Sequence, residues 1–165
     1  MLARLPRWIL LVLFATGIAL SVWRVYAWQP ERYVPNQFAT LIARMEANRW
    51  RMAGWLIADD YSDRWGFNKK SLIESGSSVF RHFRWLEIKR EGETWSRSEG
   101  SATVTVILDL KGEGTQLATI AKDTAAEATA PFVFTWKKTG PMPWHWKLSS
   151  IDQPQLNLRR WQGAQ

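Results

Sequence analysis

The chain of 165 residues contains no cysteine and only two histidines. The absence of cysteine excludes disulfides, thiol catalysis and metal sites built from thiolates. His82 and His145 are far apart in the sequence, and neither has further ligands at a metal-binding spacing, so we expect no metal and no cofactor. The pair Gly112 and Gly114 lacks the strand-to-helix context of a phosphate-binding loop, and we expect no nucleotide site.

The sequence also lacks internal repeats, low-complexity segments and long runs of one charge, and its length fits one domain with an accessory segment. Its net charge is +7, from 22 basic and 15 acidic residues. Arg4, Arg7 and Arg24 flank an apolar segment near the amino terminus. The rest of the chain therefore contains 19 basic and 15 acidic residues. These residues are spread out rather than gathered in a basic stripe, and we therefore expect no nucleic-acid partner.

The apolar segment from Trp8 to Trp23 contains no charge, and its extension to Trp28 adds only Arg24. Twenty-one helical residues span about 31 Å, which is the thickness of the hydrocarbon core of a bilayer. The sequence therefore predicts an amino-terminal anchor over residues 1–28, with a transmembrane helix over 8–28 that contacts the lipid bilayer. The competing interpretation is a cleaved signal peptide that ends near Ala27.

The basic residues Arg4 and Arg7 favour a cytoplasmic amino terminus. This orientation predicts a single-pass protein of the inner cell membrane, whose main domain lies in the periplasm. A short polar linker over residues 29–35 follows the anchor.

Three helices are expected next. The first begins with Asn36 as its N-cap and ends near Asn48, with apolar residues at helical spacing. The second covers residues 50–58. The third follows Gly66 with Asn68 or Ser71 as its cap, and Ser71 together with Glu74 matches a capping box.

The remainder of the chain has the two-residue period of strands. Residues 84–89 and 103–110 predict two strands, and the ambiguous, alanine-rich residues 116–129 are interpreted as a third. Residues 130–151 then predict an antiparallel hairpin, because prolines and a glycine separate two alternating arms. The aromatic face of this hairpin is expected to pack against the helices. It consists of Phe132, Phe134, Trp136, Trp144, Trp146 and Leu148.

The chain resembles the nuclear transport factor 2-like superfamily in the order of these elements. The residues that carry the resemblance are the stretch 55–65 (WLIADDYSDRW) and the closing pair 131–136 (PFVFTW) and 146–151 (WKLSSI). Ketosteroid isomerases and SnoaL-type polyketide cyclases share that cone-shaped fold. The resemblance implies an α+β domain over residues 36–154, in which three helices pack on a curved antiparallel sheet of about four strands, followed by a flexible tail over 155–165. It also implies a cavity between helices and sheet.

The chain is unusually rich in tryptophan, with 12 residues. Large aromatic side chains of this kind close either a core or an apolar cavity. Six of the aromatic residues are the candidates for a cavity lining: Trp55, Tyr61, Trp65, Trp85, Trp136 and Trp146.

Catalysis by a cone-fold isomerase requires a carboxylate base and a hydrogen-bond donor inside a dry pocket. Asp59, Asp60, Asp63 and Tyr61 are the only local group of these types, and three carboxylates within five residues are more typical of a solvated helix end. We therefore name no catalytic residue. The sequence favours a membrane-tethered, non-catalytic binding or scaffold domain, with a cyclase or isomerase for a small apolar substrate as the alternative. The outer sheet face, including His145, is the expected surface for a homodimer.

Overall fold

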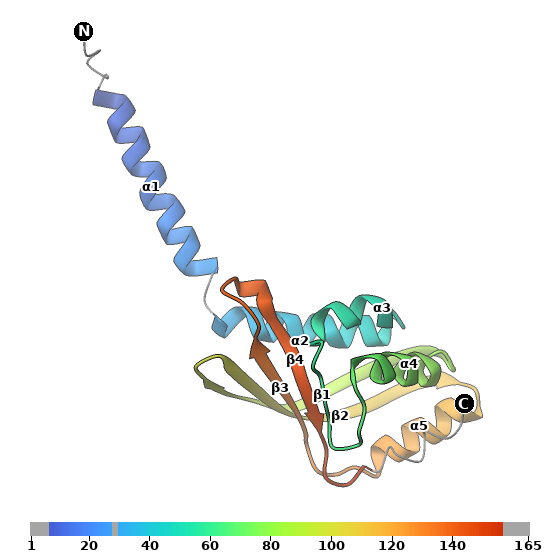
Figure 1. Cartoon of the computed structure of the whole chain (residues 1–165). Helices are drawn as coiled ribbons and strands as arrows, with labels where there is room; N and C mark the ends of the chain where they lie inside the picture. The colour runs from blue at the N-terminus through green and yellow to red at the C-terminus, as the bar shows by residue number, and fades with distance from the viewer. Residues whose placement is uncertain (1–6, 28–29, 157–165) are drawn as a thin grey trace.

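The computed structural model describes residues 7–27 and 30–156, and Figure 1 shows helix α1 (Arg7–Ala27) extending away from the rest of the fold. Its side chains are exposed from Val12 to Trp23. Among the described residues, none of the helices combines the length and hydropathy that a membrane crossing requires. Arg4 and Trp28, two residues on which the predicted anchor depends, lie outside the described ranges.

Helix α2 (Pro30–Glu46) begins earlier than predicted and includes residues 30–35 of the expected linker, so the predicted N-cap at Asn36 is wrong. Pro35 lies inside this helix. Its usual cost in a helix interior is about 3 kcal/mol. The packing of α2 offsets that cost, because Val34, Phe38 and Leu41 are fully or almost fully buried on one helical stripe.

The second predicted helix is shorter than expected. It consists of α3 (Trp50–Ala53) and a 3-10 turn, η1 (Gly54–Leu56). Ile57 then forms a parallel bridge with Leu148, and Ala58 N donates to Leu148 O at 2.8 Å. This extended segment covers an edge of the sheet that would otherwise present unpaired backbone groups.

Helix α4 (Lys69–Phe80) confirms the predicted cap at Asn68. Asn68 Oδ1 accepts a hydrogen bond from Ser71 N, and Ser71 Oγ accepts one from Asn68 N, both at 2.9 Å. The capping box thus joins Asn68 and Ser71 rather than Ser71 and Glu74, because the helix begins one turn before the pattern suggested.

The sheet contains four antiparallel strands in the order β1-β2-β3-β4. The strands are β1 (Phe83–Ser98), β2 (Ser101–Gly114), β3 (Phe132–Lys138) and β4 (Trp146–Asp152). The first two form a long hairpin, and the last two form the hairpin that the aromatic pattern predicted. The α+β class and the four-strand sheet are therefore confirmed.

Residues 116–129 were wrongly predicted to be a strand. Helix α5 (Gln116–Ala126) occupies most of this segment and returns the chain from β2 to β3 (Figure 1). Four alanines over its eleven residues give the segment a high helical propensity. This propensity decides the structure because β3 pairs directly with β2 and leaves no room for another strand between them.

Trp144 was also misplaced. It lies in a second 3-10 turn, η2 (Pro143–His145), and is 53% exposed, because β4 begins only at Trp146. The other residues of the predicted aromatic face do point inward. Phe134, Trp136, Trp146 and Leu148 are buried in one core with Phe38, whose ring lies 5.0 Å from that of Phe134.

Candidate functional site

A cavity of about 210 Å³ lies between the sheet and helices α4 and α5. Strand residues form one wall. Residues of α2, α3, α4, α5 and the loop before α4 form the others, together with Leu156. The lining consists of Met45, Trp50, Trp65, Phe67, Leu72, Ser75, Gly76, Val79, Phe80, Ile88, Leu108, Leu110, Ala121, Thr124, Ala125, Phe132, Phe134, Ile151 and Leu156. Only Ser75 and Thr124 among them carry polar aliphatic side chains, and none of these residues has an ionisable side chain.

Two indoles line this cavity and differ in their hydrogen bonding. Trp65 Nε1 donates to Leu156 O at 2.7 Å. Trp50 is 5% exposed, and its buried Nε1 has no acceptor among the described residues. A buried donor without a partner costs about 1–3 kcal/mol. Trp50 therefore carries an uncompensated buried N–H group, and so does Trp136 in the core, within the described residues.

Trp50 is held in place by helix α4. Its ring centroid lies 5.2 Å from that of Phe80 in an edge-to-face arrangement. A Cβ atom at Gly76 would come within 2.3–2.5 Å of three carbons in the six-membered ring of Trp50. The absence of a side chain at Gly76 thus allows the indole to lie directly against the α4 backbone.

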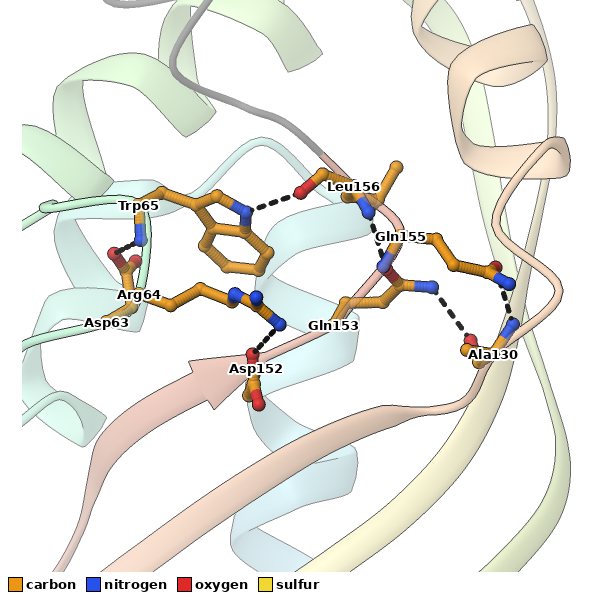
Figure 2. A network of polar contacts seen from close by, with 8 residues as sticks. All are labelled: Asp63, Arg64, Trp65, Ala130, Asp152, Gln153, Gln155 and Leu156. Carbon is orange, nitrogen blue, oxygen red and sulfur yellow. Dashed lines mark hydrogen bonds and ion pairs between the residues drawn. The ribbon is translucent and has the colours of Figure 1, made fainter.

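Near Trp65, a network of polar contacts fixes the segment that contributes Leu156 to the cavity lining (Figure 2). Gln153, which is fully buried, accepts hydrogen bonds at Oε1 from Gln155 N and Leu156 N, both at 2.7 Å. Its Nε2 donates to Ala130 O at 2.9 Å. These bonds fix the end of the described chain, so that Leu156 lines the cavity and accepts from the Trp65 indole.

The loop that contains Trp65 and Phe67 is fixed by Asp63. Its Oδ1 accepts hydrogen bonds from Trp65 N at 3.0 Å and from Phe67 N at 2.9 Å, and its Oδ2 accepts from Tyr61 Oη at 3.0 Å. Burial, followed by the nearby charge of Asp63, raises the pKa of Tyr61 well above its usual range. Asp63 therefore organises a turn rather than facing a bound molecule.

The six predicted lining residues separate into three groups. Trp65 lines the cavity. Tyr61, Trp136 and Trp146 are buried in the core but lie outside the cavity lining. Trp55 and Trp85 are 69% and 48% exposed, respectively. The structure thus brings one of the six to the cavity.

The remaining acidic candidates are in solvent. Asp59 forms an ion pair with Lys69 at 2.7 Å, and Asp60 forms one with Lys137. The hydrogen bond from each lysine lowers the pKa of its carboxyl partner below the usual value. Neither carboxylate, and neither histidine, belongs to the cavity lining.

Sequence reasoning missed Trp50 and the contributions of α5, namely Ala121, Thr124 and Ala125. The alanine-rich composition of residues 116–126 was a signal for α5. No signal in the sequence identified Trp50, because its position in a short apolar segment is equally typical of a core residue.

No protein-family model and no curated protein matches the sequence. Solved structures match at low sequence identity. One is an NTF2-like protein from Cytophaga hutchinsonii, with a TM-score of 0.51 and 16% identity over 72% of this chain and 91% of that chain. Another is a protein of Streptomyces avermitilis provisionally described as a dehydratase of the NTF2-like family, with a TM-score of 0.54 and 14% identity over 74% of this chain and 93% of that chain.

Bd1075 of Bdellovibrio bacteriovorus matches with a TM-score of 0.56 and 8% identity over 73% of this chain. The match spans only 39% of Bd1075. These likenesses show that the chain has the nuclear transport factor 2-like fold, which hosts unrelated functions.

Proposed function

We propose that this protein is a membrane-attached, non-catalytic domain that binds a small, uncharged, apolar molecule in the cavity between α4, α5 and the sheet. The observation that carries the proposal is that the described residues of the lining include no ionisable side chain. A charged ligand would lose its hydration there without gaining a partner, at a large cost in free energy. An apolar ligand would gain by leaving water.

The size of the cavity limits the ligand. A cavity of about 150 Å³ lined by aliphatic and aromatic residues can hold benzene. The cavity of about 210 Å³ therefore fits a single aromatic ring with a short substituent, or an aliphatic molecule of similar volume.

The alternative, a cyclase or isomerase, has less support. Such an enzyme needs a carboxylate or histidine within hydrogen-bond reach of its bound substrate. Asp59 and Asp60 are exposed and paired with lysines instead. The Streptomyces avermitilis protein is provisionally described as a dehydratase, but the low identity transfers only the fold to this chain and no catalytic base.

Attachment to a membrane is supported by the surface of α1. Seven large apolar side chains between Val12 and Trp23 are 50–71% exposed. Apolar surface of this extent is stabilised by lipid rather than by water. We further propose, from Arg4 and Arg7, that the amino terminus is cytoplasmic and the domain periplasmic. Pairing of two copies through the outer sheet face stays a prediction.

Filling the cavity tests the binding proposal. Ala125 lines the cavity, whereas its neighbour Ala126 is exposed. We expect toluene to raise the midpoint of thermal unfolding of the wild type and of Ala126→Phe, because a ligand of the native state stabilises it. The same concentration is expected to have no effect on Ala125→Phe. An equal response in both variants would contradict binding in this cavity.

Membrane attachment is tested separately by fractionation. The full chain is expected to remain with membranes after an alkaline carbonate wash, and a variant without residues 1–28 is expected to be released. Release of the full chain by the wash would contradict the proposal.

A further inference from the structure

We propose that the tip of the β3–β4 hairpin, defined as residues 138–145, rests on the headgroups of a bilayer that contains anionic lipid. The tip thereby forms a second contact with the membrane besides α1. This inference rests on the membrane attachment proposed above and goes beyond it, because attachment through α1 alone leaves the domain free to turn away from the lipid surface.

The first argument is the position of the tip in the fold. The turn η2, which belongs to the tip, lies beside α2. Helix α2 begins at Pro30, and α1 ends at Ala27. Three Cα–Cα steps keep these two helix ends within roughly 11 Å of each other. Figure 1 shows η2 at the end of the fold where α1 ends and α2 begins, while α5 lies at the opposite end. A bilayer that holds α1 therefore lies close to the tip.

The second argument is the aromatic surface at this end of the domain. Trp144 is largely exposed in the tip, and Trp55 is the most exposed of the tryptophans in the domain from α2 onward. Trp55 lies next to the tip, because it lines one pocket together with Thr139 and Lys147, and its carbonyl accepts a hydrogen bond from Lys147 Nζ. An exposed indole is costly in water and is suited to the headgroup region of a bilayer, where tryptophan is enriched.

The third argument is the charge of the hairpin. Residues 131–151 contain three lysines and no acidic residue. Lys137 forms an ion pair with Asp60. Lys138 is exposed, and Lys147 donates to a neutral carbonyl group. Lys138 and Lys147 thus add positive charge beside the exposed indoles, and anionic headgroups attract such charge.

The experiment uses the absence of cysteine, which allows one labelling site to be introduced at a time. Pro141 is exposed within the tip, and Thr119 is exposed on α5 at the opposite end. The full-length variants Pro141→Cys and Thr119→Cys are labelled with nitrobenzoxadiazole. Each is reconstituted into vesicles of phosphatidylcholine and phosphatidylglycerol, with and without lipid that carries a nitroxide quencher on its headgroup.

We expect the nitroxide lipid to quench the label at position 141 and to leave the label at position 119 unchanged. Trp144→Ala and Lys138→Gln, each combined with Pro141→Cys, should both reduce the quenching. The loss of one lysine near an anionic surface is expected to lower the ratio of docked to free tip about fivefold. Lys122→Gln on α5 is the matched control for Lys138→Gln and should leave the quenching unchanged.

Equal quenching at positions 141 and 119 would overturn the inference and leave the attachment through α1 intact. Equal quenching at position 141 in vesicles of phosphatidylcholine alone would do the same. Flotation of the vesicles with the full chain is measured in the same samples. A chain that does not float with the vesicles would overturn the proposed attachment and this inference together.

Discussion

Trp144 and Trp146 are two residues apart in the sequence, and the alternating pattern places them on the same face, but the structure separates them. Trp146 is 5% exposed at the start of β4, whereas Trp144 is 53% exposed in η2. Replacing each in turn by alanine therefore compares the same chemical change in the core and at the surface.

The expected magnitude for Trp146→Ala follows from its burial. A buried tryptophan removes about 200 Å² from water, and about 25 cal/mol per Å² gives roughly 5 kcal/mol as an upper value. Alanine retains part of that area, and the neighbours relax partly into the space. We expect Trp146→Ala to lower the free energy of unfolding by about 3–5 kcal/mol. Trp144→Ala is expected to change it by less than about 0.5 kcal/mol, as is usual for surface positions.

The assay is urea denaturation of the full chain in a mild detergent, followed by circular dichroism so that the lost indole does not alter the signal. The slopes of the two transitions should agree with that of the wild type, since only then do the midpoints report stability. A loss below about 1 kcal/mol for Trp146→Ala, or similar losses in the two variants, would refute the assignment of the inward face.

Two further predictions concern the surroundings of the cavity. Gly76→Ala should lower the free energy of unfolding by about 1–2 kcal/mol in the same assay, because crowding against the rigid Trp50 ring exceeds the gain of roughly 1 kcal/mol in helix propensity. An unchanged or higher stability would show that α4 moves away from Trp50 at little cost. Tyr61 has a raised pKa in the folded state, so its phenol keeps a proton that the unfolded chain releases above pH 10. Stability should therefore fall as the pH rises above 10, and Tyr61→Phe should make this fall shallower in denaturation curves between pH 8 and 11; equal falls would contradict the burial of the phenol.

The sequence predicted those parts of the fold in which local pattern and packing agree. The β3–β4 hairpin followed from strict alternation, and Asn68 followed from cap chemistry. The predictions failed where tertiary packing outweighs a local signal. Burial of Val34 keeps Pro35 inside α2, and direct pairing of β2 with β3 leaves residues 116–126 to form a helix.

The candidate site was less predictable than the fold. Aromatic residues are equally suited to a solid core and to a cavity wall, and only three-dimensional packing decides between them. Trp136 and Trp65 illustrate this, because both are buried and only Trp65 faces empty space. The error over α5 left Ala121, Thr124 and Ala125 out of the predicted lining. That the described lining residues include no ionisable side chain is a property of the assembled fold, which no single motif encodes.

The bond between the Trp65 indole and Leu156 O has a kinetic consequence. Leu156 lines the cavity and is held by a few hydrogen bonds near the end of the described chain (Figure 2). Fraying of so short a segment requires far less free energy than global unfolding. Opening of this segment would therefore widen the cavity near Trp65 much more often than the whole domain unfolds.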